Sequence, residues 1–169
     1  MQPSPRPLIT VVTFMLLAVA SCADEGGPGE STLPTLAPPG FLGTEVVPPP
    51  PALDEARVAA GETLYQLHCA SCHKADLSGE PGWMIPNDDG TYKPPPHDST
   101  GHTWHHPDQL IVEIVRDGLA DPIATMPTFG EVLSDEEILD ILEFLKSQWG
   151  PRERAFQWQV TWHAEQRTG

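Results

Sequence analysis

Apolar residues recur at helical spacing in three stretches of this 169-residue chain. The first stretch, Asp54–Cys69, is rich in good helix formers and is interrupted by Gly61. Glycine inside a helix costs about 0.5–1 kcal/mol relative to alanine, so its presence suggests that another element passes close by. We therefore expect a helix here that packs tightly against a neighbour.

The other two helices have clear start and stop signals. The second has His106 as its cap and Pro107 as its first helical residue, and ends before Gly118. The third starts at a capping box formed by Ser134 and Glu137 and ends before a glycine-proline pair. Together the three stretches predict an all-α domain.

The remaining segments carry weaker signals. Residues 74–105 contain so many prolines and glycines that a long irregular loop is expected. In residues 151–169, an extension beyond the domain, Phe156, Trp158, Val160 and Trp162 alternate with polar residues as in a strand. The pattern leaves open whether this extension packs on the domain or meets a partner.

Residues 1–21 read as an export signal. A basic residue precedes an apolar run of about 13 residues, which fits a signal peptide and is shorter than the roughly 20 residues of a membrane-spanning helix. The following Val19-Ala20-Ser21-Cys22 resembles the cleavage box of bacterial lipoproteins, which implies lipidation of Cys22. The alternative is ordinary cleavage after Ala20, which would leave Cys22 as a free thiol.

Residues 22–53 form a predicted disordered tether, because they are rich in proline and glycine and contain acidic residues but no lysine or arginine. The whole chain has a formal net charge of -15. This charge argues against nucleic acid and against charge-driven docking on anionic lipid, and it favours neutral or basic protein partners.

The sequence Cys69-Ala70-Ser71-Cys72-His73 is the strongest chemical motif in the chain. Two cysteines at this spacing, followed by histidine, are the attachment site of haem c, with His73 as an axial ligand of iron. A zinc site would need two more ligands, and a thioredoxin-like pair would sit at a helix start in a βαβ context. Both alternatives fit the sequence less well.

The stretch from about Leu53 to Trp149 resembles the class I cytochromes c: a helix running into CxxCH, a loop-rich middle, a methionine loop and a last helix. The resemblance implies a domain over residues 54–150, with three or four helices around one covalent haem. It also implies that Gly61 and Tyr65 of the first helix pack against the last helix, at Phe144.

The same resemblance implies that Met126, between the middle and last helices, is the second axial ligand of iron. Met84 or a histidine is the alternative. A His/Met pair leaves iron no open position, so such a site transfers electrons. Trp83, Tyr92 and Trp104 are expected to close the haem crevice.

Four histidines fall within ten residues: His97, His102, His105 and His106. They could cap the following helix, bind the haem propionates or face solvent. The sharper hypothesis is a second metal site for copper or zinc, which would make the chain a copper-linked redox protein.

From these features we expect an electron carrier, not an enzyme, tethered by lipid to the periplasmic side of a bacterial membrane. It would be a monomeric domain that exchanges electrons with redox proteins of the cell envelope. The alternative is a haem subunit of an oxidoreductase complex, or a copper-binding cytochrome.

Overall fold

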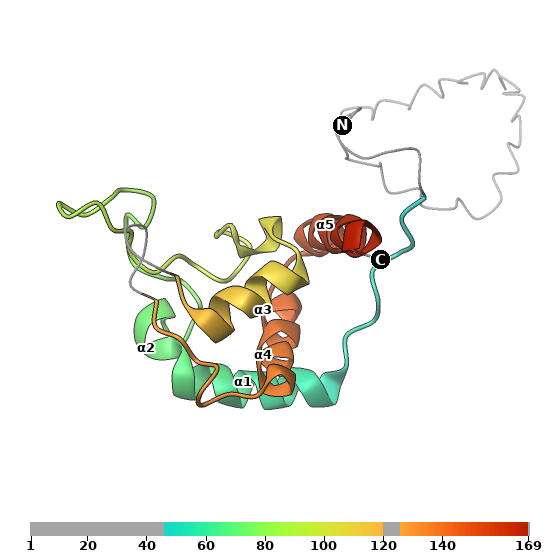
Figure 1. The fold of residues 1–169 in the computed structure, drawn as a ribbon, viewed down its shortest axis with the longest axis horizontal. Helices are drawn as coiled ribbons and strands as arrows, with labels where there is room; N and C mark the ends of the chain where they lie inside the picture. The colour runs from blue at the N-terminus through green and yellow to red at the C-terminus, as the bar shows by residue number, and fades with distance from the viewer. Residues whose placement is uncertain (1–45, 120–125, 169) are drawn as a thin grey trace, which may run out of the picture. The chain divides into compact units, whose positions relative to one another are not determined.

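The computed structural model describes residues 46–119 and 126–168, which are all helix, turn or irregular chain (Figure 1). No strand occurs in these residues, so the predicted all-α class is confirmed. The sequence predicted three or four helices, and the elements found in addition to the three that it located are the single turn Ala70–His73, the 3-10 helix Thr103–His105 and the C-terminal helix Pro151–Thr168. The helices are α1 (Glu55–His68), α2 (Ala70–His73), a 3-10 helix η1 (Thr103–His105), α3 (Asp108–Asp117), α4 (Asp135–Ser147) and α5 (Pro151–Thr168).

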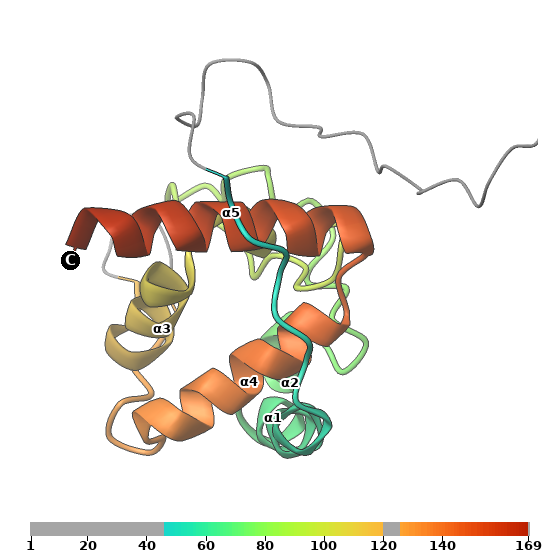
Figure 2. The same ribbon diagram turned by 90° about the vertical axis from the view of Figure 1, so that its right-hand side faces the viewer.

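The expected close approach at Gly61 occurs where α1 crosses α4 (Figure 2). A Cβ built on Gly61 would lie 1.9 Å from the carbonyl oxygen of Asp140, so only glycine fits. Tyr65 packs beside this crossing against Phe144, with ring centroids 5.4 Å apart. The packing implied by the resemblance is therefore present.

The predicted capping box begins α4. Ser134 accepts a hydrogen bond from the backbone N–H of Glu137, and the Glu137 carboxylate accepts one from the backbone N–H of Ser134. Leu133 and Ile138, on either side of the cap, are both buried in the core. The apolar face of α4 supplies a larger share of the core than any other helix, through Ile138, Ile141, Leu142, Phe144 and Leu145.

The middle helix starts at Asp108, one residue later than predicted, and the partner of its first backbone N–H comes from outside the local sequence. Pro107, not His106, is the N-cap residue, and it has no side chain that can accept a hydrogen bond. The hydroxyl oxygen of Thr161 in α5 accepts the hydrogen bond from the backbone N–H of Asp108 instead, at 3.1 Å. The C-terminal stop at Gly118 is as predicted.

The strand-like interpretation of the C-terminal extension was wrong, because this segment forms α5. Its most buried residues are polar: Gln157 and Thr161, one helical turn apart, are 2% and 1% exposed. They face the start of α3, where Gln157 donates hydrogen bonds to the His106 carbonyl and to Asp108. The alternating aromatic residues instead contact neighbours on other sides of the helix.

The last residues of the predicted tether, 46–53, are also part of the folded unit. Trp158 donates a hydrogen bond to the Pro48 carbonyl at 2.7 Å, and Arg154 donates one to the Pro51 carbonyl at 3.0 Å. Figure 2 shows this segment crossing α5 on its way to α1. The ordered domain therefore begins before the predicted boundary at Asp54.

The signal peptide (residues 1–21), Cys22 and the tether as far as residue 45 lie outside the described residues. Within the part of the chain that is described, no helix combines the length and the apolar character needed to cross a membrane.

Candidate haem-binding site

The residues of the CxxCH motif occupy one helical turn directly after α1. Cys69 ends α1 and precedes α2, and the backbone N–H of His73 donates to the Cys69 carbonyl at 2.9 Å. Residues three and four apart on a helix share a face, so Cys72 and His73 both lie on the side of Cys69. The turn therefore presents both thiols and the imidazole in one direction.

Both cysteines are free thiols in different surroundings: Cys69 is buried and Cys72 is exposed. Burial raises the pKa of the Cys69 thiol to about 11, and the neighbouring Cys72 adds to the shift. The Cys69 sulfur is thus a neutral thiol at physiological pH. Neither sulfur is committed to a disulfide, which leaves both available for thioether bonds.

The His73 side chain is held as a ligand histidine is usually held. It is 7% exposed, and its Nδ1 lies 2.9 Å from the carbonyl oxygen of Pro95. A carbonyl only accepts hydrogen bonds, so Nδ1 carries the proton and Nε2 has a free lone pair. Burial lowers the pKa of His73, which keeps that lone pair available, although the Pro95 bond acts in the opposite direction.

Two glycines, Gly79 and Gly101, allow the backbone to pack closely against the segment Pro94–Pro96, which carries the Pro95 carbonyl. A Cβ on Gly79, where φ is +62°, would lie 2.4 Å from the Pro96 nitrogen. A Cβ on Gly101 would lie 2.0 Å from the Pro96 carbonyl oxygen. Sequence reasoning missed Gly79, Pro95 and Gly101. The signal available was a glycine on each side of a run of three prolines.

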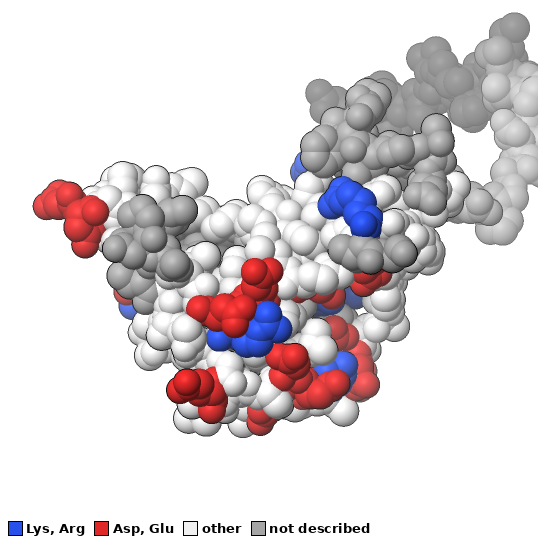
Figure 3. Space-filling model, in the orientation of Figure 1, with Lys and Arg blue, Asp and Glu red and all other residues white. Residues whose placement is uncertain are grey.

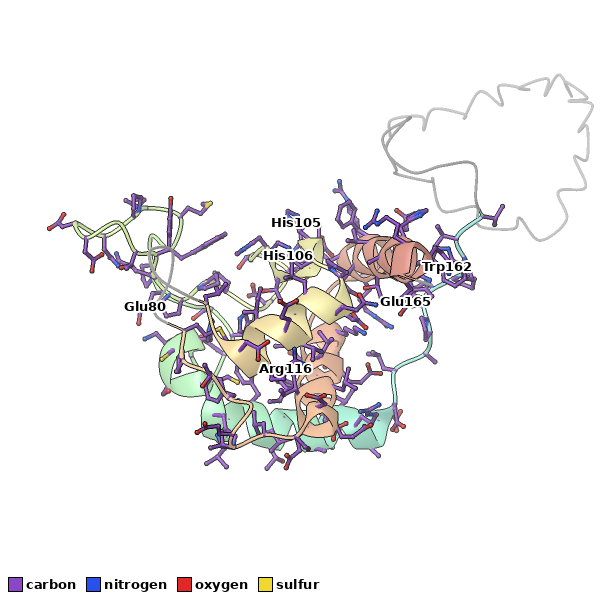
Figure 4. All side chains as sticks on the ribbon, viewed as in Figure 1. Glu80, His105, His106, Arg116, Trp162 and Glu165 are labelled. Atoms are coloured by element: carbon purple, nitrogen blue, oxygen red, sulfur yellow. The ribbon has the colours of Figure 1, made fainter. Side chains whose placement is uncertain are left out.

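The four histidines of the loop do not gather around a common point. His97 stacks on His73, with ring centroids 3.9 Å apart, and His102 stacks on Trp83 and meets His106 edge to face. His105, the last residue of η1 (Figure 4), contacts Trp104 and Phe156. Nowhere in residues 46–119 and 126–168 do three His, Cys, Asp or Glu side chains come together as a metal ion would require. The copper or zinc hypothesis gains no support.

Burial lowers the pKa of three of these histidines. For His97 the pKa falls well below the usual range, first through burial and then through neighbouring His73 and His102. Burial also comes first for His102 and His106, followed by repulsion between the clustered rings. These rings are therefore neutral at pH 7.

The three aromatic residues that were predicted to close the haem crevice differ in how far they are buried. Trp83 lies parallel to His102 at 5.1 Å, and Trp104 is partly buried against the core, whereas Tyr92 is 42% exposed. The indole N–H of Trp104 and the Nδ1 atoms of His97 and His102 are buried without hydrogen-bond partners. The Trp104 indole N–H is necessarily a donor, and an unpaired buried donor fits a carboxylate of a bound haem.

Met126 follows the end of α3. Its carbonyl oxygen accepts a hydrogen bond from Leu119 at 3.2 Å and would be 2.8 Å from a Cβ on Gly118, so the chain returns tightly here. Met84, the alternative ligand, is 70% exposed in the loop. Two imidazoles on opposite sides of one metal ion, each bonded at about 2 Å, cannot stack. His97, because it stacks on His73, would therefore not serve as a ligand opposite His73.

A family model described as cytochrome C oxidase, cbb3-type, subunit III, matches residues 56–145. The match runs from the start of α1 to near the end of α4 and covers more than half of the 169 residues. No curated protein and no solved structure matches the chain.

Proposed function

This chain belongs to the family of cbb3-type cytochrome c oxidase subunit III, and from that premise we propose that it carries single electrons on one haem c bound to Cys69 and Cys72. Membership of a cytochrome c family implies haem-based electron transfer. The single covalent haem and its ligands are our proposal. The residues present fit this group, because two free thiols and one oriented imidazole lie on one face of a helical turn.

The observation that carries the proposal is the orientation of His73. The bond from Nδ1 to the Pro95 carbonyl fixes the tautomer, so Nε2 is the atom offered to a metal. A bound haem would supply a one-electron iron couple. The chain's part is to hold the imidazole without reorganisation and to exclude water around it, which its low exposure favours.

For the second axial position we propose Met126. Its backbone is tied to the end of α3, and it is the methionine of the described domain that is partly buried, whereas Met84 is largely exposed. His97 is excluded by its stack on His73. A histidine and a methionine would leave iron no free position, and the protein would then transfer electrons without binding a substrate.

The proposed location is the periplasmic face of a bacterial membrane, with the tether attached through a lipid on Cys22. This rests on the residue pattern of the leader and of residues 22–45. The proposed partners are redox proteins of the envelope with neutral or basic docking surfaces. Acidic side chains outnumber basic ones on the face shown in Figure 3, in keeping with the net charge of -15.

The family's description favours a second candidate, in which this chain is a haem subunit of an oxidase complex and not a free monomeric carrier. The two candidates differ in the native mass of the protein. Gentle detergent extraction from the producing membrane followed by gel filtration would separate them, since a carrier would elute at the mass of one mature chain plus micelle, and a complex subunit at a much larger mass.

The haem itself is tested by expressing the chain with a haem c attachment system and measuring the intact mass. We expect the mass of one haem added to the wild type, and loss of the stable two-bond attachment in Cys69→Ala and Cys72→Ala. A wild-type chain without covalent haem would refute the proposal.

The second ligand is tested separately by the ferric absorption band of a methionine-iron bond. We expect the band in the wild type and in Met84→Leu, and its loss in Met126→Leu together with new carbon monoxide binding by the ferrous protein. A band that survives in Met126→Leu would exclude Met126 as the ligand.

A further inference from the structure

His97 lies against the imidazole that the proposed function makes an iron ligand. The two rings are 3.9 Å apart at an interplanar angle of 20°, which is a face-to-face stack. His97 is also the one histidine of the loop that touches His73. Nothing in the haem attachment itself requires a second imidazole at this place.

The backbone holds His97 rigidly from both sides. Its N–H donates to the Leu77 carbonyl at 2.8 Å, and its own carbonyl accepts from the indole of Trp149 at 2.9 Å. Leu77 follows the CxxCH turn, and Trp149 follows α4. The loop residue is thereby tied to the two parts of the domain that frame the site.

Side-chain contacts leave the His97 ring equally little freedom. The Tyr65 ring meets the His97 ring edge to face, with the ring centroids 5.9 Å apart. Tyr65 is itself completely buried beside the α1–α4 crossing. The Nδ1 atom of His97 is buried without a hydrogen-bond partner, so no bond of that atom accounts for the ring's position. The packing of the ring against Tyr65 and His73 accounts for its position.

One hydrogen bond cannot by itself fix the plane of an imidazole. The bond from Nδ1 of His73 to Pro95 sets the direction of one edge, but the ring can still swing about the line that joins these two atoms. A flat ring lying against its face removes that motion. The contacts of His97 with His73 and of Pro95 with His73 are therefore complementary restraints.

We propose that His97 is a positioning residue, whose stacked ring fixes the plane of the His73 imidazole and thereby sets the orientation of the axial ligand of a bound haem. This inference rests on the proposed haem function. It depends on the flat shape of the ring and not on its charge. Phenylalanine should therefore replace His97 in this role, whereas leucine, with similar bulk but no plane, should not.

The test uses the haem-loaded full chain and the paramagnetic NMR spectrum of its ferric form. The plane of the axial imidazole governs how unpaired spin is distributed over the porphyrin, so the haem-methyl resonances report it directly. We expect His97→Leu to change their order and spacing and to shift the reduction potential. His97→Phe should keep the wild-type order.

His105→Leu is the matched control, because this histidine of the same loop contacts Trp104 and Phe156 and not His73. Its haem-methyl pattern should be that of the wild type. Thermal unfolding of each variant separates a loss of packing from a change in ligand orientation. If His97→Leu is recovered without haem, the same NMR spectrum is measured for His97→Gln instead.

A wild-type methyl pattern in His97→Leu would overturn the inference, and so would equal changes in the Leu and Phe variants. Failure of the proposed function has a different result, because the wild-type chain would then carry no covalent haem. The two failures are thus distinguishable before any variant is compared.

Discussion

The Cα of Gly61 lies so close to the carbonyl of Asp140 that α1 and α4 touch backbone to backbone. A Cβ at this position would be 1.9 Å from the Asp140 oxygen and 2.4 Å from its carbonyl carbon, and neither atom belongs to a side chain that could move aside. Arg57 closes the same crossing at its edge, where its guanidinium donates to the Asp140 carboxylate at 2.6 Å.

Gly61→Ala is therefore expected to destabilise the protein, although alanine favours a helix. Overpacking typically costs about 1–3 kcal/mol, and the backbone contact here places the expected loss at the upper end or beyond. Urea unfolding of the haem-loaded protein measures it. Glu62→Ala, the exposed neighbour in α1, is the control and should change the free energy of unfolding by less than about 0.5 kcal/mol. An unchanged midpoint for Gly61→Ala would contradict the crossing.

The second prediction concerns the clasp between α5 and the end of the tether. Trp158→Phe keeps the aromatic ring but removes the indole N–H that donates to Pro48 at 2.7 Å. The expected cost is about 1 kcal/mol, with faster cleavage of residues 46–53 by a protease that cuts after small apolar residues. The free energy of unfolding and the cleavage rate are the two measurements.

Trp162→Phe is the matched control for this clasp. Trp162 is one turn further along α5, its ring lies 5.9 Å from that of Trp158, and its N–H has no hydrogen-bond partner. The same substitution there removes no bond and should leave cleavage of residues 46–53 at the wild-type rate. Equal effects of the two substitutions would show that the indole bond to Pro48 does not hold the segment.

Local signals in the sequence predicted the parts of the molecule whose causes are local. The capping box at Ser134 and the stop at Gly118 each depend on residues within one or two helical turns, and both are found. The role of Gly61 could be predicted because a glycine inside a helix is unfavourable unless a neighbouring element packs where a side chain would lie. The resemblance implied that the neighbour is the last helix, at Phe144, but the contact of Gly61 with Asp140 was not predicted.

The parts that sequence reasoning missed depend on contacts between distant segments. α5 was taken for a strand because its aromatic residues alternate, yet its buried face is polar. Gln157 and Thr161 form hydrogen bonds with Asp108, which lies some 50 positions away in the sequence. No local sequence pattern predicts a partner at that distance. The stack of His97 on His73 is equally non-local, since the loop between them has no regular structure.

The third prediction tests the cap that α5 supplies to α3. Thr161→Val keeps the shape of a side chain that is 1% exposed but removes the hydroxyl that accepts from the backbone N–H of Asp108. A buried donor left without a partner costs about 1–3 kcal/mol. Chemical unfolding should show this loss, whereas Thr161→Ser, which keeps the hydroxyl, should retain most of the stability. Equal stability of the Val variant and the wild type would mean that another group caps α3.

The fourth prediction is a pH dependence of the capping box. Hydrogen bonds from the backbone N–H and the hydroxyl of Ser134 to the Glu137 carboxylate lower the pKa of Glu137. The unfolded chain then binds a proton at higher pH than the folded chain does. This carboxylate therefore stabilises the fold above its unfolded pKa, about 4.3, and the contribution is lost as the pH falls through the lower folded value.

Glu137→Gln, which cannot ionise, isolates this effect. At pH 7 the variant should unfold at lower urea concentration than the wild type, and the gap between them should close as the pH is lowered from 5 toward 3. In the background of Ser134→Ala, which removes the hydroxyl donor but leaves the backbone N–H, the same substitution should open a smaller gap. A gap that is constant over this pH range would show that Glu137 acts in the cap through its shape and not through its charge, because only the charge is titrated away.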